Sequence, residues 1–411
     1  MRVYLEAQRF LVYIRSACVH SVCLKRSSLF VPHFSKLRIL QISSAQSLGG
    51  GERHLADLAN GLIHRGHDVF VAVRPHAPLT HELKNVPEEN VTTLALRNSL
   101  DVNSARDLSR LVRRNQIQIV HAHMARDYPL AAYAARMNTG AKLIITRHVL
   151  FPLNRLHRVT LSKAARIIAV SQAVASQLQA DAVTQPERVS VVLNGIDVAR
   201  FQAARQKFNR RQFLNSWELA EDSLLVGTVG ELTPLKGQEE FLRAAVPVLK
   251  QIPNAYFVIA GIDHSRGKEH RARIQRLIEK LDLTKRVRLI GWLEDLAQLY
   301  CALDVFVSSS HTESFGLALA EAMATGTPVV ATETEGAREL IQSGETGLLV
   351  SIGDVDKLAE AVLQLLNDRQ WRVHLGTEAQ KDASARFSVE RMIDETEEIY
   401  RAEIQERLDK H

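Results

Sequence analysis

The 411-residue sequence contains only three cysteines and no long apolar run. Cys18, Cys23 and Cys301 have neither the spacing of a metal site nor the even number of a disulfide framework, so we expect a reducing compartment and a cytoplasmic protein. No apolar run reaches the roughly 18 residues that a membrane-spanning helix needs. The sequence therefore argues against a disulfide-rich secreted protein and against an integral membrane protein.

The sequence signals of several other function classes are also missing. Aromatic residues make up 6% of the chain, and no zinc pattern or RNP-like aromatic motif occurs, so we expect no nucleic-acid partner. No G-x-G-x-x-G follows an expected strand, which argues against a dinucleotide oxidoreductase. No Asp-x-Asp stands at the end of an expected strand, and we therefore expect neither a metal requirement nor another cofactor.

The formal net charge of +6 conceals two halves of opposite sign. Residues 1–200 carry 26 Lys and Arg against 13 Asp and Glu, whereas residues 201–411 carry 26 against 33. The basic half suggests an anionic membrane surface or a phosphorylated acceptor as partner. Two clusters contribute to it: Arg106, Arg110, Arg113 and Arg114, followed by Arg155, Arg158, Lys163 and Arg166. They are interpreted either as solvated helix faces or as a surface that docks on the inner face of the cytoplasmic membrane.

Residues 1–36 form an N-terminal extension that we treat separately. This segment holds one acid, Glu6, and six Lys or Arg residues, with an apolar stretch but no clear cleavage site. Three interpretations stay open: a start codon assigned too far upstream, an amphipathic surface anchor, and a targeting segment.

From residue 37 onward, short β-branched runs alternate with segments of helical period. Strands are expected at 37–42, 69–73, 117–121, 143–146, 167–170 and 189–193, and again at 224–229, 256–260, 287–290, 305–308, 328–331 and 347–350. This alternation predicts parallel sheets that are covered by helices on both faces. A charged, helix-prone segment near residues 200–223 separates the two series.

We therefore predict an α/β protein with two Rossmann-like, doubly wound domains that face an interdomain cleft. Residues 37–205 form the first domain in this prediction and residues 206–387 the second, while residues 388–411 form a helix that crosses back to the first. Such folds bind ligands beyond the carboxyl ends of their strands. Functional motifs are thus expected at strand-to-helix turns.

The strongest motif follows an expected strand of the second series and runs into a short helix. Glu313 precedes that helix and can accept hydrogen bonds from a sugar, whereas Glu321 lies about two turns into it and can bind both hydroxyls of a ribose. Between them, the backbone N–H groups of Phe315, Gly316 and Leu317 direct a positive helix end at a phosphate. The alternative is that Glu313 caps the helix and that Glu321 is a solvated acid.

At these residues the sequence resembles the E-x7-E signature of the retaining GT-B glycosyltransferases, and specifically glycosyltransferase family 4. Family-like segments recur in the expected order at residues 49–52, 119–123, 146–148, 170–171, 194–197, 236–237 and 346–350, and at Asp354. The resemblance implies a retaining, hexosyltransferase-type enzyme with a UDP- or GDP-linked donor and a glycan or lipid-linked acceptor. Its setting by analogy is bacterial surface polysaccharide or lipopolysaccharide synthesis. A nucleotide-sugar epimerase of the same fold and a non-catalytic nucleotide-sugar-binding subunit remain as alternatives.

The same resemblance gives roles to the glycine run before the first helix. Gly50 and Gly51 are expected to contact the donor phosphates, because glycine lets backbone amides crowd a pyrophosphate. Glu52 and Arg53, at the start of the helix, are expected to face the acceptor. The alternative is a flexible surface turn.

Lys236 begins the first helix of the second half and is expected to bind the donor and stabilise the leaving diphosphate. A solvated first-turn lysine is the alternative. The sequence departs from the family here, since many members have Arg where this chain has Glu231. Either diphosphate binding is weaker, or another base supplies the second charge. Arg147 is the candidate for that charge and also a candidate acceptor contact.

His148 ends an expected strand and, by the resemblance, lies beside the donor sugar and takes part in catalysis with Glu313 and Lys236. The alternative for His148 is a structural role. We interpret His121 as buried at a strand end and His123 as a candidate cleft residue, with a structural role favoured for both. No covalent nucleophile is obvious, so the family mechanism implies a same-face displacement in which the leaving phosphate draws the acceptor's proton.

Overall fold

The computed structural model describes residues 36–408, apart from residues 152–154, 183 and 294. The N-terminal extension with Glu6 lies outside the described residues, so its three interpretations stay predictions. The sheets described below belong to one unit, Leu37–His411. Within the described residues, no helix combines the length and the apolar character that crossing a membrane requires.

In the described part of the chain, seven parallel strands form the first sheet, in the order β3-β2-β1-β4-β5-β6-β7. The strands are β1 (Arg38–Ser43), β2 (Asp68–Val73), β3 (Val91–Thr93), β4 (Ile119–Ala122), β5 (Lys142–Arg147), β6 (Arg166–Ala169) and β7 (Val189–Val191). The connecting helices are α2 (Gly50–His64), α3 (Val102–Arg114), α4 (Tyr128–Arg136), α5 (Arg155–Leu161) and α6 (Gln172–Ala180). Short 3-10 helices are η1 (Pro78–Glu82), η2 (Glu88–Asn90), η3 (Ala125–Asp127) and η4 (Pro186–Arg188).

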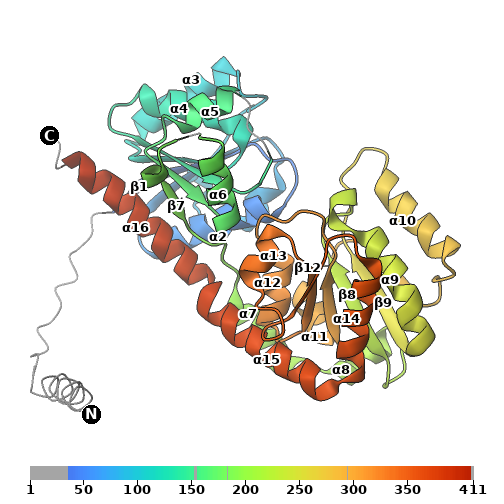
Figure 1. Cartoon of the computed structure of the whole chain (residues 1–411). Helices are drawn as coiled ribbons and strands as arrows, with labels where there is room; N and C mark the ends of the chain where they lie inside the picture. The colour runs from blue at the N-terminus through green and yellow to red at the C-terminus, as the bar shows by residue number, and fades with distance from the viewer. Residues whose placement is uncertain (1–35, 152–154, 183, 294, 409–411) are drawn as a thin grey trace, which may run out of the picture. The chain divides into compact units, whose positions relative to one another are not determined.

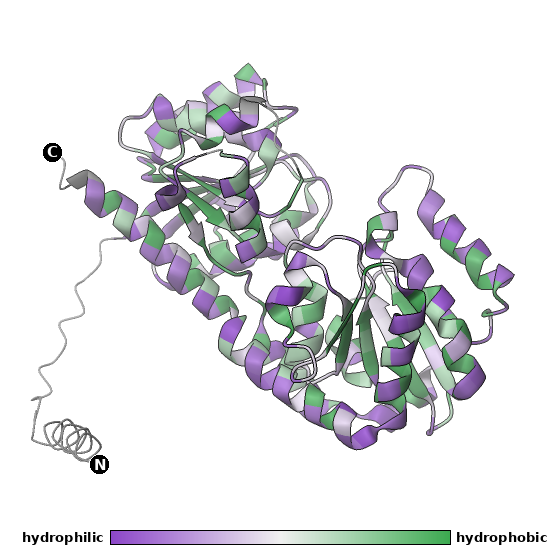
Figure 2. Ribbon diagram, viewed as in Figure 1, coloured by the Kyte–Doolittle hydropathy of each residue, from purple (hydrophilic) through white to green (hydrophobic). Residues whose placement is uncertain are grey.

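The central strands of this sheet bury both of their faces. In β1, Ile39 packs with Leu55 of α2, while Leu40 packs with Leu108 of α3 and Ala131 of α4. Because successive side chains of a strand point to opposite faces, helices must cover the sheet on both sides. Figure 2 shows the result as hydrophobic strands between helices whose outer faces are hydrophilic.

The second sheet has six parallel strands among the described residues, in the order β10-β9-β8-β11-β12-β13. The strands are β8 (Leu224–Val229), β9 (Ala255–Ala260), β10 (Val287–Ile290), β11 (Val305–Ser308), β12 (Val329–Thr332) and β13 (Leu348–Val350). The helices are α7 (Val198–Lys207), α8 (Arg210–Ser216), α9 (Gln238–Gln251), α10 (Glu269–Lys280), α11 (Leu296–Ala302), α12 (Leu317–Ala324), α13 (Glu335–Leu340), α14 (Val355–Asn367), α15 (Arg369–Arg386) and α16 (Val389–Leu408), with η5 (Pro234–Lys236). Figure 1 shows α9 and α14 on one side of β8 and β12, with α11 and α12 on the other.

These two doubly wound parallel sheets confirm the predicted fold class. The strands expected at 224–229, 287–290 and 305–308 have the bounds that were predicted. The first sheet contains one strand more than expected, β3. The sequence analysis missed it because its three residues, Val91–Thr93, are few and at most partly buried, so they give no apolar run.

Helix α7 (Val198–Lys207) packs on the second sheet, although most of it precedes the expected division at 205/206. Val198 and Phe201 lie in one core cluster with Tyr300 of α11 and Leu319 of α12. Judged by its side-chain packing, the part of the chain that belongs with the second sheet therefore begins no later than α7. The division into an acceptor domain and a donor domain stays a prediction.

The C-terminal helix α16 packs against α2 of the first sheet (Figure 1). A Cβ added to Gly61 of α2 would lie 2.2 Å from the Cδ1 atom of Ile393, so the two helices approach closely at this glycine. Arg65 adds an ion pair to Glu397 at 2.9 Å. Farther along α16, the fully buried Tyr400 reaches side chains of β1 and β4.

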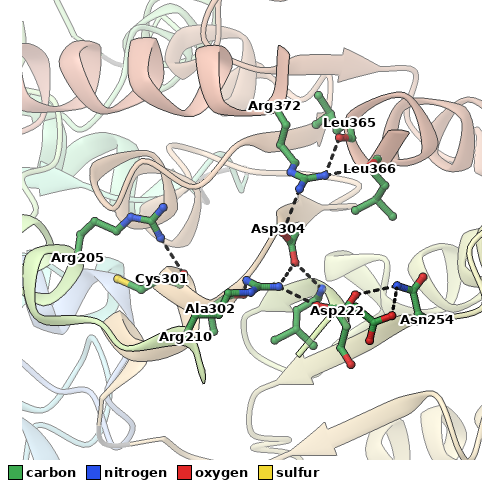
Figure 3. Close-up of polar contacts among 12 residues, drawn as sticks. Arg205, Arg210, Asp222, Asn254, Cys301, Ala302, Asp304, Leu365, Leu366 and Arg372 are labelled. Atoms are coloured by element: carbon green, nitrogen blue, oxygen red, sulfur yellow. Dashed lines mark hydrogen bonds and ion pairs between the residues drawn. The ribbon is translucent and has the colours of Figure 1, made fainter. Parts of the chain in front are cut away.

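Asp304, directly before β11, ties parts of the second sheet together (Figure 3). Its carboxylate accepts hydrogen bonds from Arg210 of α8 at 2.6 Å and from the backbone N–H of Leu225 at 2.8 Å. An ion pair to Arg372 of α15 adds a third contact at 3.3 Å. Because β11 leads into the Glu313 loop, these contacts anchor the strand that carries the candidate site.

Candidate active site

A cavity of about 510 Å³ lies between the carboxyl ends of strands from both sheets. Ten of the twelve residues expected in the site line it: Gly50, Gly51, Arg53, His148, Lys236, Glu313, Phe315, Gly316, Leu317 and Glu321. The other two, Glu52 and Arg147, are not among its lining residues. The sequence-derived motifs therefore converge on one place, with two exceptions that have local causes.

Two glycines shape the second-sheet side of the cavity. Gly316 has φ +103° and is the N-cap of α12, so its left-handed backbone turns the chain into the helix. Gly237 has φ +62°, and a Cβ there would lie 1.9 Å from the carbonyl oxygen of Ser309. A side chain at Gly237 would clash with the Ser309 backbone, and one at Gly316 would be strained by its positive φ. The N-terminal end of a helix such as α12 favours an anion.

Lys236 and Glu313 form an ion pair, with 2.5 Å between Nζ and Oε2. The pair joins η5 to the loop after β11, and both side chains are partly exposed to the cavity. An ammonium group has three N–H donors, so Lys236 retains donors for a phosphate while it holds Glu313. The two groups expected to act on the donor thus position each other.

Glu321 is buried and is held by two side chains. The hydroxyl of Tyr300 donates to Oε2 at 2.8 Å, and Nη1 of Arg53 lies 3.3 Å from Oε1. Burial raises the pKa of the Glu321 carboxyl, while the Arg53 charge and the Tyr300 hydrogen bond lower it. Arg53, expected at the acceptor, therefore contacts the carboxylate expected at the ribose, and no local sequence pattern indicates Tyr300.

Glu52 acts within its own helix. Its Oε2 accepts a hydrogen bond from the backbone N–H of Gly49 at 3.0 Å, which completes the start of α2. Glu at the third position of a helix is a known capping signal. Glu52, expected to face the acceptor, is thus not among the residues that line the cavity. Its spacing of three residues from Gly49 is the sequence signal for this capping contact.

Arg147 lies on the other side of the strand end from His148. Its side chain is buried and donates to the carbonyl oxygen of Phe151, next to Tyr128. Successive residues of a strand point to opposite faces, so His148 and Arg147 cannot both face the cavity. Arg147, the candidate for the second charge on the diphosphate, is thus not among the residues that line the cavity, whereas the exposed Glu231 is.

Four histidines lie together beside the cavity: His54 of α2, His121 of β4, His123 and His148. Burial lowers the pKa of His54 to about 4 and lowers the pKa values of the other three well below their usual range. All four are therefore neutral at pH 7. Only His148 lines the cavity, so His121 and His123 are buried residues, as the favoured interpretation had them.

A chain of hydrogen bonds connects α16 to His148. Gln41 donates from Nε2 to the hydroxyl of Tyr400 at 3.2 Å, and its Oε1 lies 2.7 Å from Nε2 of His123. Because an amide oxygen only accepts, this nitrogen of His123 carries the hydrogen. His123 Nδ1 then accepts from His148 Nε2 at 3.2 Å.

This polarity fixes the tautomer of His148. With the hydrogen on Nε2, its Nδ1 presents a lone pair. That atom is buried and has no hydrogen-bond partner among the residues that the structure describes. His148 is thus prepared to accept a hydrogen bond from a ligand hydroxyl. Gln41 and Tyr400 were missed, since only the fold brings positions so distant in the sequence together.

Two models of protein families match the chain. The model described as Glycosyltransferase Family 4 matches residues 48–200, and that described as Glycosyl transferases group 1 matches residues 209–382. Together they span most of both sheets, including the glycine run and the Glu313–Glu321 motif.

Two curated relatives match over nearly their whole length. N-acetyl-alpha-D-glucosaminyl L-malate synthase of Bacillus anthracis is 26% identical over 380 residues, which cover 89% of this chain and 97% of the relative. UDP-Gal:alpha-D-GlcNAc-diphosphoundecaprenol alpha-1,3-galactosyltransferase of Escherichia coli is 25% identical over 382 residues, with the same two shares.

Solved structures share the fold. HepE of Anabaena in complex with UDP and glucose superposes with a TM-score of 0.76 at 24% identity, over 88% of this chain and 99% of HepE. A glycosyltransferase of Rickettsia africae gives 0.80 at 21% identity, over 90% and 99% of the two chains.

Proposed function

This chain belongs to the group 1, family 4 glycosyltransferases of the GT-B fold, and we propose that it is a retaining, hexosyltransferase-type enzyme that needs no metal ion. Transfer of a sugar from a nucleotide-sugar donor is the activity of this family. The proposal adds the stereochemistry, a UDP- or GDP-linked donor, and a glycan or lipid-linked acceptor in surface polysaccharide or lipopolysaccharide synthesis.

The observation that carries the proposal is the convergence of Lys236, Glu313, Glu321 and His148 on one cavity. Its volume of about 510 Å³ suits a nucleotide-sized ligand, since small-molecule sites commonly measure about 300–1,000 Å³. We assign the ribose to Glu321, the diphosphate to Lys236 and the start of α12, and the sugar to His148 and Glu313.

In the proposed reaction, the bond between the anomeric carbon and the phosphate oxygen breaks, and the diphosphate leaves with the electron pair. The acceptor oxygen bonds to the anomeric carbon on the same face, and its proton passes to the departing phosphate. Lys236 stabilises the negative charge that develops on the diphosphate. The lone pair of His148 Nδ1 holds a sugar hydroxyl and thereby orients the ring.

An anionic membrane surface is proposed to present the acceptor. In support, Leu100 is 74% and Val102 56% exposed at the start of α3, and the four arginines of that helix are exposed as well. The E. coli relative is named for a diphosphoundecaprenol-linked substrate. Within the first cluster Arg110 pairs with Asp107 of the same helix, while Arg106, Arg113 and Arg114 are exposed. In the second cluster Arg158 pairs with Asp181, and Arg166 pairs with Glu403 of another helix. We therefore assign docking to α3 and place the protein on the cytoplasmic side of the membrane.

A panel of nucleotide sugars tests the proposal. A donor should raise the melting temperature of the wild-type protein and of Glu335→Gln, an exposed control on α13, but have little effect on Glu321→Gln. The matching donor should then be hydrolysed slowly, and NMR of the transfer product should show the anomeric configuration of the donor.

Other outcomes point to the alternatives. A donor that is converted to its epimer without any acceptor would indicate an epimerase. Binding with neither hydrolysis nor transfer would indicate a non-catalytic subunit, for which the acid at Glu231 is the supporting feature. No thermal shift with any nucleotide sugar would refute the proposal.

A further inference from the structure

We propose that His54, His123 and His148 form a binding site for a divalent transition-metal ion of the zinc class, and that the bound ion blocks the sugar end of the cavity. One nitrogen atom from each ring lies within 4.8 Å of one nitrogen from each of the others. Three elements supply them: α2 for His54, the end of β4 for His123, and the end of β5 for His148. The effect on turnover rests on the proposed function, whereas ion binding does not.

Two of the three rings have a nitrogen available for an ion. His54 Nε2 and His148 Nδ1 are buried without a hydrogen-bond partner in the described part of the chain. His54 uses its other nitrogen for Asn194, at 2.9 Å, and Asn194 itself lines the cavity. Buried polar atoms are normally paired, so these two orphaned atoms point to a missing ligand.

The third ring has to give up a hydrogen bond. His123 uses Nδ1 for His148 and Nε2 for Gln41. Ligands about 2.0–2.1 Å from a tetrahedral zinc ion lie about 3.4 Å apart, and His123 Nδ1 lies 3.2 Å from His148 Nε2. If His148 binds the ion through Nε2 rather than through its unpaired Nδ1, this pair is already spaced as two ligands.

The chemistry of the three groups selects the ion. Burial lowers the pKa of each ring, so the imidazoles are neutral at pH 7, which is the form that binds metals. Imidazole nitrogens suit Zn²⁺, Ni²⁺, Co²⁺ and Cu²⁺, whereas Mg²⁺ and Ca²⁺ prefer oxygen ligands. Three histidines also leave a fourth position open toward the cavity.

Ion binding removes the hydrogen-bond acceptor that the proposed reaction uses. If His148 binds the ion through Nδ1, the lone pair of that atom is occupied. If it binds through Nε2, the hydrogen of the neutral ring moves to Nδ1, which becomes a donor. In either case Nδ1 no longer accepts from a sugar hydroxyl, and the ion and the donor sugar exclude each other.

Competition with a chromophoric chelator measures binding without any need for turnover. Untagged full-length protein should withdraw one Zn²⁺ per chain from the chelator, and Mg²⁺ at the same concentration should not displace it. His54→Gln and His123→Gln should each weaken binding at least about tenfold. His64→Gln, an exposed position on the same helix α2, should retain the wild-type affinity.

The outcomes separate the two proposals. Lost binding in both histidine variants supports the site, and unchanged binding in both overturns it. If either variant fails to fold, the visible spectrum of the Co²⁺-loaded wild-type protein decides, since tetrahedral nitrogen ligation gives intense d–d bands and octahedral hydration does not. With a donor identified, Zn²⁺ should inhibit competitively and EDTA should restore the rate. Inactivity toward every donor would sink the proposed function and leave the chelator result valid.

Discussion

Replacing Tyr400 with Phe tests whether the C-terminal helix sets the tautomer of His148. The change removes one buried hydroxyl, which accepts from Gln41 at 3.2 Å and donates to His121 at 2.5 Å. The ring of Tyr400 remains and fills the same space. Any effect therefore comes from the hydrogen bonds.

The cost in stability follows from the two lost bonds. Each hydrogen bond contributes about 0.5–1.5 kcal/mol net, so Tyr400→Phe should lower the free energy of unfolding by about 1–3 kcal/mol. For domains of about 150–250 residues, each kcal/mol lowers the melting temperature by about 2–4 °C. Scanning calorimetry or fluorimetry will measure this loss.

The expected loss of activity follows from the direction of the hydrogen bonds that link Tyr400 to His148. All hydrogen bonds between Tyr400 and His148 must run in the same direction, so only two arrangements are possible. The amide orientation of Gln41, with Nε2 toward Tyr400 and Oε1 toward His123, corresponds to one of them. Without the hydroxyl, Gln41 can turn over, and His148 Nδ1 then carries the hydrogen. Equal populations would halve kcat, and a preference of about 1.4 kcal/mol for the reversed direction would lower it about tenfold.

Steady-state kinetics of donor hydrolysis or transfer will measure the change, with kcat falling more than donor KM rises. Tyr133→Phe, on an exposed residue of α4, is the matched control. Adding Gln41→Glu to Tyr400→Phe should restore kcat but not stability, because a carboxylate can only accept from His123. A Tyr400→Phe protein that melts earlier but keeps its full kcat would refute the reasoning and leave Tyr400 a structural residue.

Four further predictions follow from the site and its surroundings. Glu321→Ala should weaken donor binding by about 1.5–3 kcal/mol with the fold intact, and unchanged affinity in calorimetry would remove Glu321 from the nucleotide site. Activity should survive saturating EDTA, and a fall to background that Mg²⁺ or Mn²⁺ reverses would contradict the metal-free mechanism. Burial and the nearby Asp197 raise the pKa of Asp57 from 3.8 to about 7. The folded state therefore loses stability as the pH rises through this range, and Asp57→Asn should raise the melting temperature clearly at pH 8 but little at pH 4. A protein that starts near Ser35 should bind anionic vesicles less at high salt, and replacing Arg110, Arg113 and Arg114 with Glu should weaken that binding while sparing donor hydrolysis; no binding at low salt would refute membrane docking.

The predictability of the strands depended on how apolar their residues are. The strand at 224–229 could be bounded from sequence because it is a central strand with a continuous apolar run. Strand β3 (Val91–Thr93) escaped because two of its three residues are threonines, whereas the equally short edge strand β7 (Val189–Val191) has two valines and was predicted. The packing of helix α7 on the second sheet was not predicted, since its charged sequence hides the two buried residues, Val198 and Phe201, that join it to the second core.

The site was predictable where chemistry and local spacing coincide. Glu313 and Glu321 flank a glycine-led helix start, so their place in the cavity follows from the chain alone. Arg147 shows the limit, because its direction depends on which face of β5 meets the cavity, a fact of tertiary packing. Tyr300 and Tyr400 lie far along the chain from the groups that they hold, and no local pattern identifies them.

The charges around the cavity suggest how the chain functions with an acid at Glu231. In the structure, each cation that lines the cavity pairs with an acid assigned to the donor: Arg53 with Glu321, and Lys236 with Glu313. A ribose that engages Glu321 must displace Arg53 from one carboxylate oxygen, because the other already accepts from a tyrosine hydroxyl. The released guanidinium lines the same cavity as Lys236 and the start of α12, to which we assign the diphosphate. Arg53, freed by the ligand itself, is therefore the residue best placed to supply the positive charge that Glu231 cannot.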